Sequence, residues 1–354
     1  MTPPVPELLA KLLRAAGPPG AERAPVGVWR EAAAGFATVE TDAMGTPTAR
    51  VEGTGDGPTL AIVGHIDEIA LLVTHITDSG FLKLISSDGW DAQILVGQRV
   101  EVLTAGGPIP GVVGRKPAHL LEDEDRKRAV QLKHLAVDIG ARDGDQAREL
   151  VQIGDQVVAA VEPVELRNGR LASRSLDNRL GSYVALEVAR RVAEAGGAQG
   201  PVVGAAAVME EIGTIGAGPL AYGLQPDLAI VVDVTHASDA PGVDADQIGH
   251  HPLGSGPALT RGAIPHPVLF ERLRAVATER EIPFTIEAEG RATHTDADAV
   301  HRSRRGIPTS LVGIPLRYMH TPVETVDLED VENVVALITA FALGLEAGVD
   351  LRRW

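Results

Sequence analysis

The chain has 354 residues, 44% of them hydrophobic, which is enough for one large domain or two moderate ones with a packed core. Its net charge of −16 argues against nucleic acid and anionic membrane as partners, because both attract basic surfaces. The absence of cysteine excludes thiolate ligands, so a bound metal must use histidine and carboxylate side chains. No signal-peptide pattern or bilayer-length apolar run (~20 residues) is present, and we therefore expect a soluble, cytoplasmic protein.

The N-terminal part predicts a short helix and then a buried strand. Residues 7–16 have the spacing of an amphipathic helix, which the Gly-Pro-Pro-Gly sequence at 17–20 ends. The apolar run at 59–63 is typical of a buried strand, and it leads directly to His65 and Asp67. Side chains alternate along an extended chain, so these two lie on the same side. One side chain can then bind a metal while the other orients the metal-binding side chain.

The pattern changes between residues 69 and 162. Short β-like runs with frequent glycines occur at 70–76, 81–85, 99–103, 111–113 and 156–161. This texture is typical of a small β-barrel or sandwich. The charged stretch 122–128 is expected to be a solvated loop or helix face. We therefore predict that an all-β insertion at 69–162 interrupts one domain built from 1–68 and 163–354.

Strands and helices alternate again after residue 174. This alternation predicts an α/β fold with a mostly parallel sheet and helices on both faces. The expected elements are a helix at 178–194, strands at 202–209, 228–232 and 310–316, and a C-terminal helix that opens with the acidic residues 327–330. Apolar positions recur at helical spacing in the last helix, at Val331, Val334, Val335, Ile338 and Phe341.

Acidic and histidine side chains follow these apolar runs, where open α/β sheets build their sites. A pair of catalytic divalent ions needs a histidine and a carboxylate for each ion, a shared carboxylate and a free carboxylate as base. Consecutive side chains diverge, so one member of a Glu-Glu pair can bind metal while its neighbour faces a water. Each residue alone has a more common structural explanation, but together they predict a two-metal hydrolytic site. The candidates are His65, Asp67, Asp177, Glu210, Glu211, Asp233 and His320.

Longer motifs surround these positions. They are residues 15–22, 64–70, 89–91, 97–100, 116–119, 137–141, 176–179, 210–213, 233–236 and 314–320. With these motifs the chain resembles, over essentially its whole length, the cage-forming dinuclear-metal aminopeptidases of the glutamyl and deblocking aminopeptidase family, some of which carry an endoglucanase label. In related deacylases and carboxypeptidases the extra domain lies between the fourth and fifth ligands, whereas here the β-rich segment precedes Asp177.

The resemblance implies a role for each candidate. Asp177 bridges two ions, with Zn²⁺ or Co²⁺ expected, and the peptide bond after Asp177 is cis. His65 and Asp233 complete one metal site, and Glu211 and His320 complete the other. Glu210 is the general base, and Asp67 orients His65.

The resemblance also implies substrates and an assembly. The substrates are peptides that lose their N-terminal residue. The insertion at 69–162 mediates a homodimer, and dimers can build a tetrahedral dodecamer whose sites face inward. Relatives usually carry two glycines where this chain has Thr293-His294. The resemblance therefore does not extend to the preferred N-terminal residue.

Three other functions were weighed. A deacylase of small N-acyl amino acids would use the same chemistry. A glycosidase needs only two carboxylates about 5–10 Å apart, which leaves the other ligands unexplained, and the 3% aromatic content is poor for stacking on sugars. A non-catalytic assembly protein with a vestigial site is disfavoured because all seven candidate positions are intact.

Overall fold

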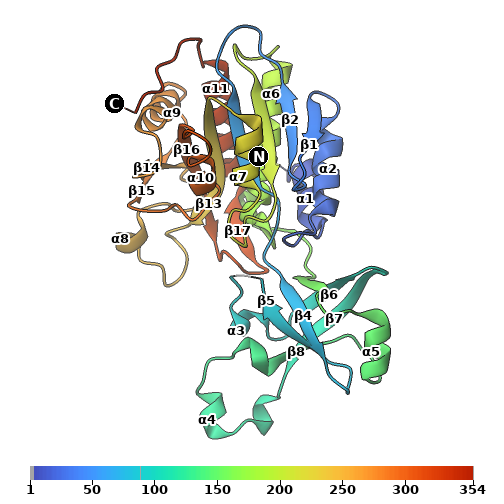
Figure 1. Ribbon diagram of the computed structural model, residues 1–354. Helices are drawn as coiled ribbons and strands as arrows, with labels where there is room; N and C mark the ends of the chain where they lie inside the picture. Colours follow the sequence, from blue (N-terminus) through green and yellow to red (C-terminus); the bar gives the residue numbers. More distant parts are fainter. Residues whose placement is uncertain (1–3, 88, 354) are drawn as a thin grey trace. The chain divides into compact units, whose positions relative to one another are not determined.

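The computed structural model describes residues 4–87 and 89–353, and its backbone contacts divide the chain into two units (Figure 1). The larger unit contains the chain up to Asp67, Pro163–Met319 and the residues from Val323 onward. The smaller unit contains Glu68–Glu162 together with His320–Pro322. Each unit has its own hydrophobic core and is described separately.

The larger unit is built on a sheet with the strand order β1-β2-β12-β3-β13-β16-β17-β11-β10. Its centre is parallel: β12 (Val202–Ala207), β3 (Leu60–His65), β13 (Leu228–His236) and β16 (Thr309–Arg317) run in the same direction. The flanking strands pair antiparallel, and β14 pairs with both β16 and β15. These remaining strands are β1 (Thr38–Thr41), β2 (Pro47–Val51), β10 (Val164–Glu165), β11 (Arg170–Ser173), β14 (Ala258–Gly262), β15 (Thr285–Glu289) and β17 (Glu324–Asp327).

Helices cover both faces of this sheet, which confirms the predicted fold class. Alternate side chains of β3 enter different cores, so that Ile62 faces one layer while Ala61 and Val63 face the other. The first layer contains α1 (Glu7–Arg14), α2 (Arg23–Ala33), α6 (Leu176–Glu194), α9 (Pro267–Glu279) and α11 (Leu328–Leu343), and the second contains α7 (Ala217–Leu224) and α10 (Ala297–Val300). A further short helix is α8 (Ala245–Ile248).

Glycine lets α6 approach β3 closely. A Cβ atom added to Gly64 would lie 2.2 Å from the backbone carbon of Gly181 in α6. A larger residue at position 64 would therefore push the helix away from the strand. The residue just before His65 thus brings the start of α6 next to the end of β3.

The smaller unit is a closed antiparallel barrel with the order β4-β5-β8-β7-β6-β9. The predicted small β-barrel of the insertion is confirmed, and short helices connect its strands. The charged stretch 122–128 contains a helical turn, and the side chains described in it are exposed, as expected. The strands are β4 (Leu71–Ile76), β5 (Leu82–Ser86), β6 (Arg99–Thr104), β7 (Gly107–Arg115), β8 (Leu135–Asp138) and β9 (Gln156–Ala159), and the helices are α3 (Ala92–Leu95), α4 (Asp123–Arg126) and α5 (Gly144–Leu150).

Some boundaries differ from those expected. β13 continues to His236, so Asp233 lies inside this strand, opposite Gly313 of β16, and not just after its end. The strand extends because β16 reaches Arg317 and supplies a pairing partner along this whole length.

Within the described residues, no helix combines the length and the apolar character needed to cross a bilayer.

Candidate metal centre

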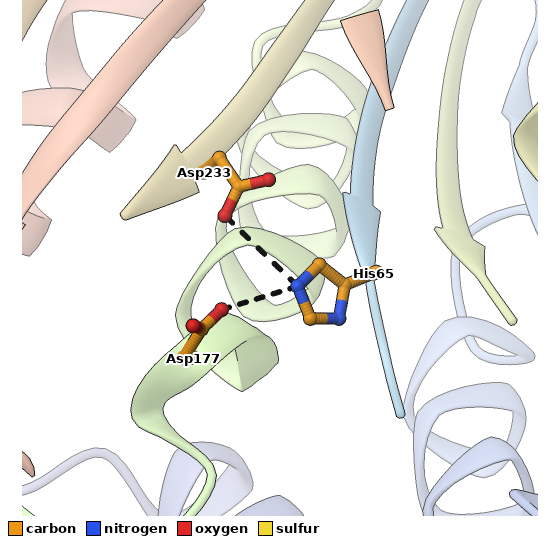
Figure 2. A group of neighbouring side chains, drawn as sticks. All are labelled: His65, Asp177 and Asp233. Atoms are coloured by element: carbon orange, nitrogen blue, oxygen red, sulfur yellow. Dashed lines mark hydrogen bonds and ion pairs between the residues drawn. The ribbon is translucent and has the colours of Figure 1, made fainter. Parts of the chain in front are cut away.

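Three predicted ligands of the larger unit converge in a buried group (Figure 2). His65 ends β3, Asp177 lies in the first turn of α6, and Asp233 lies in β13. The Nε2 atom of His65 is 3.1 Å from Oδ1 of Asp177 and 4.0 Å from Oδ1 of Asp233. Figure 2 shows both carboxylates directed at the same ring nitrogen. The imidazole is only 2% exposed, so these groups meet where water is largely excluded.

Asn178 connects Asp177 to the strand that carries Asp233. Its side-chain amide donates a hydrogen bond to the carbonyl of Val232 (2.8 Å) and accepts one from the amide of Gly181 (2.7 Å). The beginning of α6 is thereby held against β13, and Asp177 with it. The Asp177–Asn178 peptide bond is cis, as predicted.

Asp67 joins the imidazole to the loop that follows β12. Its Oδ1 atom lies 3.2 Å from Nδ1 of His65. The two carboxylate oxygens also accept hydrogen bonds from the backbone amides of Glu210 (3.0 Å) and Glu211 (3.1 Å). Sequence reasoning proposed only the contact with His65. The structure adds that the same carboxylate sets the backbone of the Glu-Glu pair.

Glu22 supports this loop from another direction. Its Oε1 atom accepts hydrogen bonds from the amides of Gly20 (2.8 Å) and Met209 (3.0 Å). Met209 has a positive φ of 56°, a conformation that side-chain-bearing residues rarely adopt. The buried Glu22 carboxylate therefore stabilises a strained turn next to Glu210. Glu22 was seen in the sequence only as the last residue of the 15–22 motif.

Glu210 and Glu211 have different surroundings. Oε2 of Glu210 lies 3.8 Å from Nε2 of His65. Burial is the main cause that raises the pKa of Glu210, to about 10; His65 opposes the shift, whereas the negative charge of Asp233 adds to it. Glu211 is buried and offers a carboxylate oxygen within 4.8 Å of one from Asp177. Asp177 is therefore near both of its predicted neighbours in the larger unit.

His320 follows β16 and has its contacts with the smaller unit, as do the next two residues. Within that unit it packs against Gly89, where an added Cβ atom would lie 2.1 Å from Nδ1 of His320. The group that the larger unit builds alone contains the other six predicted residues. The role of His320 stays a prediction.

The donor chemistry of the larger unit fits a divalent cation. Burial raises the pKa of Asp233 well above its ordinary value, and the charge of Asp177 adds to this effect. Burial disfavours the charged form of His65, yet Glu210, Asp177 and Asp67 together raise its pKa well above the ordinary value. Such crowding of negative charge is relieved by a bound cation. Imidazole nitrogen and carboxylate oxygen are ligands that suit Zn²⁺ and Co²⁺.

A further acidic residue lies in this electrostatic environment. Asp296, immediately before α10, is 1% exposed. Burial raises its pKa to about 7; the charge of His65 opposes this shift, and that of Asp67 adds to it. The sequence contained Asp296 only as part of the Thr295-Asp296-Ala297 match, and no role was predicted for it.

Comparison with known proteins identifies the family of this chain. The sequence pattern of the M42 glutamyl aminopeptidase family matches residues 45–337. The chain belongs to this family. The match spans both units, and it confirms the resemblance predicted from the motifs. This M42 family member is therefore a peptidase-type hydrolase of the aminopeptidase class.

Relatives of this M42 protein include several named aminopeptidases. It is 33% identical to a lysyl aminopeptidase of Pyrococcus furiosus over 304 residues, which cover 85% of this chain and 86% of the relative. A TET aminopeptidase from a marine sediment Thaumarchaeota archaeon has a TM-score of 0.91 at 33% identity, with 96% of each chain covered. A TET peptidase of Pyrococcus horikoshii, which can assemble into a tetrahedron or a large octahedral shell, has a TM-score of 0.84 at 32% identity and covers 96% of this chain and 99% of its own.

Proposed function

We propose that this chain is a two-metal aminopeptidase that removes the N-terminal residue from peptides. The observation that carries the proposal is the buried convergence of His65, Asp177 and Asp233, with a carboxylate oxygen of Glu211 within 4.8 Å of one from Asp177. One imidazole and several carboxylates in a dry site form a strong set of ligands for a divalent ion. Membership of an aminopeptidase family gives the same reaction class.

The residue types and the family resemblance suggest how two ions would be held. His65 and Asp233 would bind one ion and Glu211 and His320 the other, with Asp177 shared between them; Zn²⁺ or Co²⁺ is expected. Such a pair supplies Lewis-acid polarisation of the scissile carbonyl and an acidified water. Elemental analysis and anomalous scattering of the purified protein should find up to two ions per chain, about 3.5–4 Å apart. Ligands other than these five residues would overturn the assignment.

Glu210 is the proposed general base. Its carboxylate takes a proton from the attacking water and returns it to the leaving amine, which requires hydrogen-bond reach to both. Its main-chain amide is held by Asp67, which also faces Nδ1 of His65. Asp67 therefore keeps the base and the first ligand in one fixed arrangement, and it selects the tautomer of His65 that leaves Nε2 as the metal-binding atom.

The substrate class is peptides with a free amino terminus. The relatives' names differ, since one is a lysyl and another, from Lactococcus lactis, a glutamyl aminopeptidase. The preferred side chain therefore varies among relatives of this chain, and the Thr293-His294 segment is a reason not to transfer it. A deacylase of N-acyl amino acids remains the second candidate, because the same ligands and base would serve it.

The decisive experiment is an assay of metal-free protein with each divalent ion added back. The substrates are a panel of aminoacyl-nitroanilides and the matching N-acetylated amino acids. We expect release of nitroaniline with Zn²⁺ or Co²⁺ and little hydrolysis of the acetylated compounds. The opposite preference would establish the deacylase, and metal-independent hydrolysis would overturn the two-metal mechanism.

A further inference from the structure

Asp296 is a buried carboxylate that the mechanism above does not use. Its side chain is 1% exposed. Among the residues that the structure describes, 4–87 and 89–353, neither of its carboxylate oxygens has a hydrogen-bond partner. A buried carboxylate without a donor is costly, so native structures rarely keep one unless another molecule supplies the missing partner.

The fold places Asp296 on the side of the sheet to which the side chains of His65 and Asp233 project. The next residue, Ala297, packs in one cluster with Val63 and Val231. These two residues lie two positions before His65 and Asp233, so their side chains share a face with the two ligands. Helix α10 packs on β13 and β16, with Asp296 at its N-terminal end.

Electrostatic effects agree with this placement. The negative charge of Asp296 raises the pKa of Glu210 and of Asp233. In turn, His65 and Asp67 influence Asp296. Asp296 does not belong to either group of possible metal ligands among the described residues. It therefore lies within electrostatic reach of the centre without being one of its ligands.

Hydrogen bonds among its neighbours hold the backbone on both sides of Asp296. The carboxylate of Asp298 accepts hydrogen bonds from the amide (2.9 Å) and hydroxyl (2.7 Å) of Thr293 and from the amide of His294 (3.0 Å). The Thr295 hydroxyl accepts one from the amide of Ala297 (3.2 Å). The side chains of its neighbours thus accept the hydrogen bonds of the loop amides. The side chain of Asp296 itself makes no cap hydrogen bond to the helix.

The charges at the centre indicate what Asp296 binds. Two divalent ions would be offset largely by Asp177, Glu211 and Asp233. Asp67 already accepts hydrogen bonds from two backbone amides. Glu210 is the proposed base that accepts a proton from the attacking water. Asp296 remains as a buried carboxyl group with two open acceptor positions. A cation that arrives with the substrate would favour its ionised form and fill these positions.

We propose that Asp296 binds the protonated α-amino group of the peptide substrate and so restricts the enzyme to free amino termini. This inference rests on the proposed aminopeptidase function and adds the residue that reads the terminus. A charge-assisted hydrogen bond in a buried site contributes about 1.5–3 kcal/mol, which corresponds to roughly 10- to 100-fold in affinity.

Binding measurements on the metal-loaded protein test the proposal. The probes are the amide of the amino acid that the nitroanilide panel prefers, its N-acetyl form and its desamino form, in which hydrogen replaces the amino group. The unsubstituted protein should bind the amino form about 10- to 100-fold more tightly than the desamino form. In Asp296→Asn this difference should nearly vanish, while affinity for the N-acetyl form and the metal content remain unchanged.

Several outcomes would overturn the inference. An unsubstituted protein with equal affinity for the amino and desamino forms would do so without any variant. Asp296→Asn that keeps the discrimination, or that loses metal, would assign Asp296 to a structural or ligand role. Asp296→Ser serves as a second variant, with the same expectation. If the unsubstituted protein hydrolyses no nitroanilide, the proposed function fails; if it does and discrimination persists in the variants, only the role of Asp296 fails.

Discussion

Asp67 and Glu210 are neighbouring carboxylates whose surroundings suit them to different tasks. Asp67 accepts two backbone amides and faces Nδ1 of His65, so its charge is used to hold other groups. Glu210 lies 3.8 Å from Nε2 of His65, and its pKa is raised mainly by burial. The raised proton affinity of Glu210 suits it to accept a proton, whereas the oxygens of Asp67 are occupied by two backbone amides.

Replacement of Glu210 separates catalysis from metal binding. Glu210→Gln keeps the size of the side chain but removes the proton acceptor, so kcat should fall roughly 10²- to 10⁴-fold while metal content and KM change little. Glu211→Gln is the matched control, and it should weaken metal binding at one site. The measurements are steady-state kinetics and elemental analysis. Near-normal activity of Glu210→Gln would contradict the proposed mechanism.

Replacement of Asp67 should affect both metal binding and catalysis, because Asp67 contacts His65 and also the loop after β12. Asp67→Asn retains one acceptor oxygen but places an amide donor against either a backbone amide or His65. We expect metal affinity to fall about 10- to 100-fold, the usual effect of losing a group that orients a ligand, and kcat to fall as well. Isothermal titration with Zn²⁺ would measure the first effect. Unchanged affinity would show that the 3.2 Å contact does not orient the ligand.

At the level of elements, the loop after β12 depends on segments distant in sequence. Asp67 follows β3 and Glu22 precedes α2, yet both accept amides from residues 209–211. The loop contains two non-glycine residues with positive φ, Met209 and Thr214. The conformation of this loop therefore depends on Asp67 and Glu22, which lie outside it. Loss of either carboxylate should change the position of Glu210, the proposed general base.

Glu22→Ala would leave the amides of Gly20 and Met209 without their acceptor. Each buried amide that loses its partner costs about 1–3 kcal/mol. We expect faster hydrogen exchange at residues 208–216 and a lower kcat, with metal content retained. Glu31→Ala, an exposed residue of α2, is the control and should change neither property. Unaltered exchange in Glu22→Ala would show that Asp67 holds the loop without help.

Asp330 of α11 should make the free energy of unfolding depend on pH. It is buried and accepts hydrogen bonds from the amides of Gly254 and Gly256, both at 2.7 Å. Burial, partly offset by these amides, raises its pKa to about 7. Because the folded pKa exceeds the unfolded one, Asp330 favours folding most at low pH. This contribution is lost as pH rises from about 4 to about 7.

Urea unfolding at a series of pH values would test this. Asp330→Asn should remove part of the decline in unfolding free energy between pH 4 and 7. Glu329→Gln, the exposed neighbour on the same helix, should leave that decline intact. Identical pH profiles for the Asp330→Asn and unsubstituted proteins would contradict the assignment.

At the level of the whole molecule, we propose that the barrel of residues 69–162 mediates self-association, first as a dimer and then as a tetrahedral dodecamer. The solved TET relative that forms a tetrahedron or an octahedral shell supports the idea. The barrel also exposes large apolar side chains, among them Ile85 on β5 and Val112 on β7, at 53% and 48% exposure. Burial of such side chains between two copies would remove apolar surface from water.

Light scattering should therefore report a dimer or a larger particle. Ile85→Glu combined with Val112→Glu should shift it toward monomer, whereas Tyr222→Glu, exposed on the larger unit, should not. The net charge of −16 opposes close packing of copies, so association should tighten with salt if repulsion limits it. Monomer alone at all salt, metal and protein concentrations would remove this proposal and leave the chemistry untouched.

The pattern of residue types along the sequence was sufficient to predict the α/β class and the β-rich segment, and it named residues that converge in the buried group. Apolar spacing indicated the helix that ends near Glu194 and the strand before His65, because periodicity reflects burial of one face. It did not indicate α2, where Pro25 and Gly27 weaken the helical signal around the buried Trp29. It also ended the strand at Val232, since the pairing that extends β13 comes from β16.

The contacts that organise the centre could be found only from packing. Nothing near Asp67 in the sequence indicates that its oxygens accept the amides of Glu210 and Glu211, because the loop reaches it through the pairing of β3 with β12. Asp296 likewise reaches the centre only because α10 packs on the face that presents His65 and Asp233. Residue chemistry and periodicity can be read from neighbouring positions in the sequence. The burial of a side chain and its hydrogen-bond partners depend on which distant segments pack around it.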